Sequence, residues 1–138
     1  MAEIKTTYKG DMLFETKVGN HVISADVPAV MGGHDRAVTP PDLFLASLSS
    51  CIGAFAAAYC CEHDICTDDL AVTLEFEKAS DPTRLVNLKA RLELPHADCG
   101  KRAAAIKRAA MHCPVHESIK VFDGFELELV TPKNGDQE

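Results

Sequence analysis

The chain has 138 residues, 46% of them hydrophobic and 25% charged, with a formal net charge of −7. This composition fits one globular domain over residues 1–138 and excludes a largely disordered protein. The excess of acidic residues argues against a nucleic-acid-binding protein, which needs a cationic face to displace counterions.

The N-terminal residues show no basic stretch followed by an apolar run, so no secretory signal is predicted. We therefore expect a cytoplasmic protein. In that reducing compartment the six cysteines are more consistent with thiols or ligands than with a disulfide framework.

The first part of the chain predicts three antiparallel strands. Apolar and polar residues alternate along residues 12–18, and Gly19-Asn20 offers positive φ for a tight turn before a partner strand. The strands are expected at 3–9, 12–18 and 21–27, and a glycine-containing loop at 28–41.

A long apolar helix is predicted after this loop. The pair Pro40-Pro41 suits a helix start, and Asp42 places a carboxylate in the first turn, where the helix dipole favours it. Residues 43–61 carry no charge and are long enough to span a bilayer. Because this segment is rich in Ala and Ser and has acidic flanks, we expect a helix buried inside a soluble protein.

The second half predicts two strands, two helices and a last strand. In the first two strands apolar and polar residues alternate, so one face packs against the core and the other faces solvent. In the last strand apolar residues alternate with glutamates. The polar tail over 131–138 is expected to fray. The ranges are strands at 71–77 and 84–94, a helix at about 99–112, a helical turn after Pro114, and a strand through Phe125, Leu127 and Leu129. The resulting order, βββ-α-ββ-αα-β, is an α+β fold.

Two cysteines occupy positions that could carry chemistry. Cys113 precedes Pro114 at a helix start, where free backbone N–H groups and the helix dipole favour a thiolate and lower the thiol pKa. Its alternative role is a small buried hydrophobe. Cys51 lies inside the apolar helix, where burial would keep it an unreactive core residue unless a cation lies beside it.

The other four cysteines give weaker signals. Their spacing is not the Cys-x₂-Cys pairing of structural zinc sites, and Cys113-x₂-His116 lacks a second ligand pair. We therefore predict no metal and no cofactor, and read these residues as helix-end and loop cysteines. They are Cys60, Cys61, Cys66 and Cys99.

Two segments together resemble the OsmC/Ohr family of osmotically induced and organic hydroperoxide resistance proteins. TPPDLFLASLSSC, residues 39–51, resembles the family's Pro-x-Glu-Leu-Leu-x-Ala-x-x-x-x-Cys helix. CPVHESI, residues 113–119, is similar to its Cys-Pro-Val-x-x-x-Leu segment. The resemblance implies antiparallel sheets packed around a long central buried helix. It also implies an intertwined homodimer in which the two cysteines meet near the interface.

The resemblance further implies a cysteine-dependent thiol peroxidase of the oxidative stress response, acting on organic hydroperoxides without a bound cofactor. Cys51 would be the peroxidatic thiolate that becomes a sulfenic acid, and Cys113 the resolving thiol that forms a disulfide with it. A dithiol reductant would restore both thiols by exchange. The apolar helix would accept the hydrocarbon part of the substrate.

In the family an arginine, oriented by a glutamate, holds the reactive cysteine ionised. Asp42 matches the acidic position but lies nine residues before Cys51, so it could act only through an intermediary. No Gly-Gly-Arg motif occurs in the predicted N-terminal strands, which makes Arg36 the candidate cation and Lys9 a poorer one.

The missing motif points to a general OsmC-like member rather than a hydroperoxide-resistance protein proper. Two alternatives therefore stay open. One is an OsmC-like module that binds a small ligand or a metal, and the other is a redox sensor without peroxidase turnover.

Overall fold

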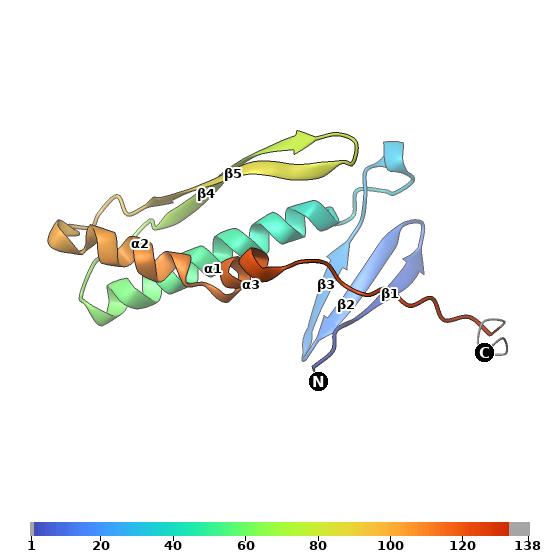
Figure 1. Ribbon diagram of the computed structural model, residues 1–138, viewed down its shortest axis with the longest axis horizontal. Helices are drawn as coiled ribbons and strands as arrows, with labels where there is room; N and C mark the ends of the chain where they lie inside the picture. The colour runs from blue at the N-terminus through green and yellow to red at the C-terminus, as the bar shows by residue number, and fades with distance from the viewer. Residues whose placement is uncertain (1, 133–138) are drawn as a thin grey trace.

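The computed structural model describes residues 2–132, which form two antiparallel sheets and three α-helices with the long helix α1 running through the middle (Figure 1). Residues 133–138, most of the tail predicted to fray, lie outside the described residues. The elements are β1 (Lys5–Gly10), β2 (Leu13–Val18), β3 (His21–Ala25), α1 (Pro40–Glu62), β4 (Ala71–Ala79), β5 (Arg84–Glu93), α2 (Ala103–Met111) and α3 (Pro114–Val121), with short 3-10 turns η1 (Ala29–Met31) and η2 (Gly100–Arg102).

The predicted N-terminal meander is confirmed. β2 pairs antiparallel with both β1 and β3, and Gly19 at φ +60° makes the turn between Val18 and its partner His21. Figure 1 shows this sheet beyond the start of α1, with no helix lying across it. Apolar side chains such as Val22 therefore remain exposed.

Helix α1 begins as predicted. The Thr39 side chain accepts a hydrogen bond from the Asp42 backbone N–H at 3.3 Å, and its hydroxyl donates to the Asp42 carboxylate at 2.8 Å. The hydroxyls of Ser47 and Ser50 donate hydrogen bonds to backbone carbonyls of the preceding turn. These bonds satisfy the hydroxyl groups within the helix itself. In length and composition α1 could cross a membrane, as core helices of soluble proteins also can.

One stripe of α1 forms the centre of the core. The β4–β5 hairpin packs against α1, and α2 lies alongside it (Figure 1). Between them, apolar residues three and four apart on α1 meet residues of α2 and the start of α3. The buried members are Leu48, Ile52, Ala56, Cys60, Ile106, Ala110 and Cys113. Beside this stripe α1 is more open, with Phe44 40% and Phe55 39% exposed.

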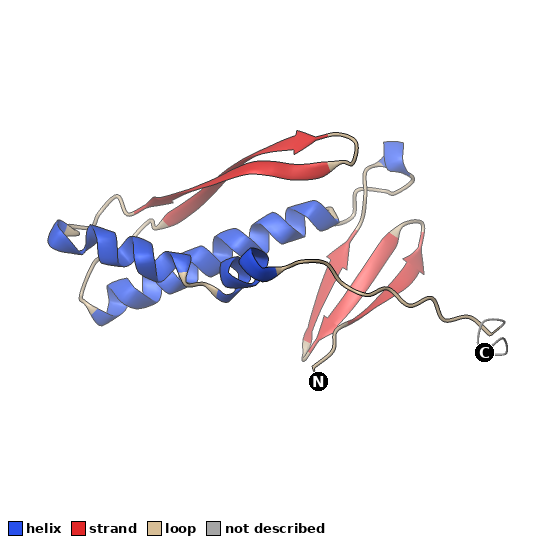
Figure 2. Cartoon of the chain, in the orientation of Figure 1, coloured by secondary structure: helices blue, strands red, loops and turns tan. Residues whose placement is uncertain are grey.

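The C-terminal third differs from the sequence prediction in two ways. The second helix begins as the 3-10 turn η2, and the turn expected after Pro114 is the eight-residue helix α3. The predicted last strand does not form, and residues 122–131 run as extended chain (Figure 2). A strand needs a neighbour to pair its backbone groups. Among the described residues the chain supplies none, so Phe125 and Leu127 are about 90% exposed.

Candidate thiol site

The structure brings Cys51 and Cys113 together, although they are 62 residues apart in the chain. Cys51 lies half-buried in the middle of α1, and Cys113 is fully buried at the N-cap of α3. Cys51 packs against the core cluster that contains Cys113, and a hydrogen bond with Cys51 is among the influences that raise the pKa of Cys113. Both cysteines are free thiols. The fold therefore brings the two residues that the resemblance paired close to each other.

Burial raises the pKa of the Cys113 thiol, and the hydrogen bond with Cys51 raises it further. The backbone N–H groups of His116 and Val115 act in the opposite direction, with His116 N donating to Cys113 Sγ at 3.4 Å. The sequence prediction that the helix start lowers this pKa is therefore wrong, because desolvation outweighs the helix-start hydrogen bonds.

An apolar cavity of about 470 Å³ is lined by Ile52, which follows Cys51 in α1, and by His116, whose backbone N–H donates to Cys113 Sγ. Leu48 and Ile52 line it from α1, on the turns that flank Cys51, and Ile119 lines it from α3. Leu74 and Leu88 of the hairpin form the opposite wall. The cavity has the size and apolar lining typical of a site for a small hydrophobic molecule.

Arg36 is held by a buried carboxylate. Its Nε donates to Asp26 Oδ2 at 2.7 Å, and its Nη2 donates to the Asp11 carbonyl at 2.8 Å. Asp26 is only 1% exposed and also accepts backbone hydrogen bonds from Val27, His34 and Arg36. The side-chain hydrogen bond from Arg36, with these backbone bonds, holds the pKa of Asp26 well below its usual range.

Sequence analysis missed Asp26. The available signal was an acidic residue at the end of a strand, before a Gly-Gly loop that contains an arginine. The loop closes so tightly that a Cβ on Gly33 would run into the Val27 carbonyl and the Asp26 carboxylate.

The remaining candidates have partners of their own. Asp42 bonds with Thr39, and Lys9 forms an ion pair with Glu15 at 3.7 Å. Within residues 2–132, no hydrogen bond or ion pair joins Arg36, Asp42 or Lys9 to Cys51. Their catalytic roles stay predictions.

The other four cysteines differ in exposure. Cys60 is buried, Cys99 is half-buried, and Cys61 and Cys66 are exposed. The described part of the chain contains no group of three or more His, Cys, Asp or Glu side chains placed to hold a metal ion. Nothing in the side-chain geometry of that part therefore favours the metal-binding alternative.

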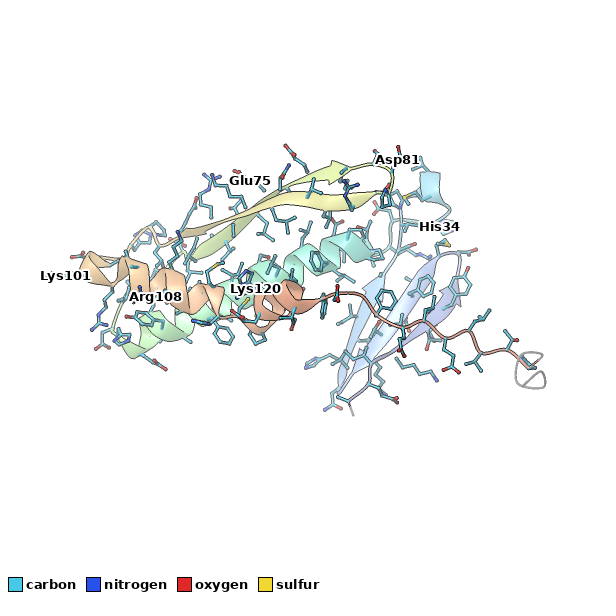
Figure 3. The ribbon with its side chains drawn as sticks, viewed as in Figure 1. His34, Glu75, Asp81, Lys101, Arg108 and Lys120 are labelled. Atoms are coloured by element: carbon cyan, nitrogen blue, oxygen red, sulfur yellow. The ribbon has the colours of Figure 1, made fainter. Side chains whose placement is uncertain are left out.

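The basic residues of the second helix lie on its solvent side. Lys101 and Arg108 are exposed along η2 and α2 (Figure 3), which is usual for a solvated helix face.

Comparisons with known proteins agree with this architecture. Residues 33–122 match the family model described as OsmC-like protein. Among solved structures, an osmotic stress induced and detoxification response protein from Psychrobacter arcticus 273-4 is 25% identical with a TM-score of 0.74, the match covering 86% of this chain and 88% of that one. An OsmC-like protein from Mycoplasma pneumoniae is 17% identical with a TM-score of 0.66, covering 86% of each chain.

A third solved structure is similar in fold. It is an organic hydroperoxide resistance protein OsmC from Legionella pneumophila, 22% identical with a TM-score of 0.60, and the match covers 86% of this chain and 88% of that one. No curated protein matches the chain. Because the family model spans more than half of the chain, the protein belongs to the OsmC-like family.

Proposed function

We propose that the protein reduces organic hydroperoxides, with Cys51 as the peroxidatic cysteine and Cys113 as the resolving cysteine. The observation that carries this proposal is that Cys51 packs against the buried apolar cluster that contains Cys113, close enough for Cys51 to influence the pKa of Cys113. A buried thiol pair of this kind can hold and pass on two electrons without a bound cofactor.

The proposed reaction has two oxidative steps and one reductive step. The Cys51 sulfur, as thiolate, attacks the terminal peroxide oxygen and breaks the O–O bond. The alcohol leaves after taking up a proton, and Cys51 becomes a sulfenic acid. Cys113 then attacks the sulfenic sulfur, water leaves, and a Cys51–Cys113 disulfide forms. A dithiol reductant returns both residues to thiols by exchange.

The substrate class rests on the lining of the neighbouring cavity. Its walls are mainly aliphatic and aromatic side chains of α1, α3 and the hairpin, so an organic hydroperoxide gains from burying its hydrocarbon part there. Hydrogen peroxide lacks that part and should be a poorer substrate. The structural similarity to a hydroperoxide resistance protein of Legionella supports the same class.

The proposal includes a homodimer. The β1–β3 sheet and the segment after α3 both expose apolar side chains, and a second copy of the chain could cover them. The alternation of Phe125, Leu127 and Leu129 with glutamates suits a strand that pairs only in such an assembly.

The direct test is peroxide consumption by a cysteine variant. Cys51→Ser should remove most of the consumption of cumene hydroperoxide in the presence of a dithiol, because serine cannot form a sulfenic acid. Cys61→Ser, on the exposed side of the same helix, is the matched control and should keep the wild-type rate. A Cys51→Ser protein as fast as wild type would refute the proposal. If the wild-type protein consumes one equivalent of hydroperoxide per chain and then stops, even with a dithiol present, the result would favour the redox sensor.

Arg36 and Asp42 are kept in the proposal as candidate cation and acidic partner. Arg36→Ala should move the pH dependence of the peroxidase rate to higher pH if the guanidinium stabilises the thiolate. Arg36→Lys, which keeps the charge without the fork, should restore the profile in part. If Arg36 serves only to stabilise the fold by pairing with Asp26, both variants will lose thermal stability and the pH profile of the peroxidase rate will not shift. That result would exclude a catalytic role for Arg36.

A further inference from the structure

A second pair of cysteines lies between the same two helical segments as the first. Cys60 follows Cys51 by nine residues on α1, about 14 Å along the helix axis. Cys99 immediately precedes η2, at the start of the α2 region. Because α1 and α2 run in opposite directions (Figure 1), Cys60 and Cys99 both lie at the end of this helix pair that is remote from Cys113.

Three observations place Cys60 and Cys99 close together. Arg102 of η2 donates a hydrogen bond to the hydroxyl of Tyr59 at 3.1 Å, which ties the turn after Cys99 to the residue before Cys60. Both cysteines pack in the same hydrophobic cluster. After burial, charge on Cys99 is the next largest influence that raises the pKa of Cys60, ahead of its covalent neighbour Cys61.

The two thiols differ in access. Cys60 is 0% exposed, and burial raises the pKa of its thiol. Cys99 is half-buried and lines a cavity of about 550 Å³ together with Leu92, Leu94 and Ile106. A small apolar molecule in that cavity can contact Cys99, whereas Cys60 is not part of the lining.

We propose that Cys60 and Cys99 form a second redox-active thiol pair, which an organic hydroperoxide entering this cavity converts into an intramolecular disulfide. The Cys99 sulfur attacks the peroxide, the O–O bond breaks, and the products are Cys99 sulfenic acid and an alcohol. The Cys60 thiol then attacks the sulfenic sulfur, a disulfide forms and water leaves. Two thiols lose two electrons and one hydroperoxide gains them.

The pair is independent of the proposed peroxidase reaction, since neither step uses Cys51 or Cys113. A disulfide needs Cα atoms within about 7 Å of each other, so one partner must be able to adjust. Cys99 lies on the irregular connection over residues 94–99, whereas Cys60 is fixed in α1.

Geometry also selects Cys60 over the nearby cysteines. Cys61 is one residue further along α1, about 100° around the helix, and it is exposed. Cys66 is exposed on the connection after α1. Neither belongs to the buried cluster that contains Cys60 and Cys99.

The test uses a Cys51→Ser/Cys113→Ser protein, which retains four of the six cysteines. After treatment with cumene hydroperoxide and alkylation, it should lose two thiols per chain. Trypsin should release a linked pair of peptides, residues 37–78 joined to residues 92–101. Because Cys60, Cys61 and Cys66 share the first of these peptides, further variants assign the bond. Cys60→Ala should abolish it, and Cys61→Ser should leave it intact.

Three results would overturn the inference. They are no loss of thiols, a bond that survives Cys60→Ala, and a bond between two chains on a non-reducing gel. Cys99→Ala, at a half-buried position that tolerates a small side chain, provides a second variant if Cys60→Ala does not fold, and it should also abolish the linked peptides. If wild type shows no peroxide turnover while this disulfide forms, the proposed function fails and the inference stands.

Discussion

At the scale of single residues, burial decides what each sulfur of the first pair can do. Cys113 lies at a helix start, which on its own would favour a thiolate, but the residue is fully buried and its pKa rises. A resolving cysteine needs to remain a thiol until a sulfenic acid appears beside it. Cys51 is less buried than Cys113 and immediately precedes Ile52, which lines the neighbouring cavity, and this position suits the attacking role.

Asp26 is the buried charge of the fold, and its environment predicts an acid sensitivity. Its folded pKa is held below the unfolded value, first by Arg36 and then by backbone N–H groups. Such a group stabilises the fold above its unfolded pKa of about 3.9, and this contribution is lost as the pH falls below that value.

We therefore expect Asp26→Asn to lower the Tm at pH 6, where the wild-type carboxylate is ionised and paired. We expect the Tm of wild type to fall between pH 5 and pH 3 as Asp26 of the unfolded chain begins to take up a proton. The Tm of Asp26→Asn should fall less over the same range, because the amide does not titrate. Thermal unfolding followed by circular dichroism measures both, with Asp68→Asn on an exposed turn as the control. Equal Tm values for Asp26→Asn and wild type at pH 6 would show that the ionised Asp26 carboxylate and its hydrogen bonds do not stabilise the fold.

At the scale of elements, the segment after α3 is the clearest mismatch between pattern and structure. Its residues alternate as in a strand, yet they run as exposed extended chain because the described part of the chain offers no strand beside them. Strand pairing depends on a neighbour that local sequence does not specify. The proposed homodimer would supply such a neighbour from the second copy of the chain.

Replacing one apolar residue of this segment should therefore weaken the dimer. Leu127→Asp removes the burial of a leucine, worth about 1.5–3 kcal/mol, so the dissociation constant should rise about tenfold or more. Sedimentation equilibrium gives the constant, and wild type should have about twice the monomer mass of 14.9 kDa. Glu128→Gln changes the other face of the same strand and should have little effect. A wild-type protein that is monomeric at micromolar concentration would contradict the dimer.

Elements with a strong local pattern could be predicted from the sequence. The hairpins were predicted from the alternation of apolar and polar residues and from the Gly19-Asn20 turn, and α1 from the proline pair, Asp42 and a long uncharged run. The meeting of Cys51 with Cys113 came from the family resemblance, because no local rule connects residues so far apart. The Asp26–Arg36 pair was missed since it depends on how a loop folds back, and the Cys113 pKa depends on burial that only packing reveals.

At the scale of the whole molecule, the chain exposes a large part of its apolar surface. The β1–β3 sheet stands away from the helices, and one face of α1 stays open (Figure 1). Both surfaces are the kind that monomeric proteins usually cover. A second copy covering them would also enclose the Cys51 cavity and limit the access of water and of large thiols to the sulfenic acid.

The central claim, that Cys51 and Cys113 act as one redox pair, is tested most directly by mapping the oxidised protein. Wild-type protein is treated with one equivalent of cumene hydroperoxide, alkylated, and digested with trypsin and chymotrypsin, which separates Cys51 from Cys60 by cleavage after Phe55 and Tyr59. We predict a Cys51–Cys113 linked peptide in wild type and a sulfenic acid on Cys51 in Cys113→Ser. A fully alkylated Cys51 in peroxide-treated wild type, with the oxidation found on other residues, would contradict the account.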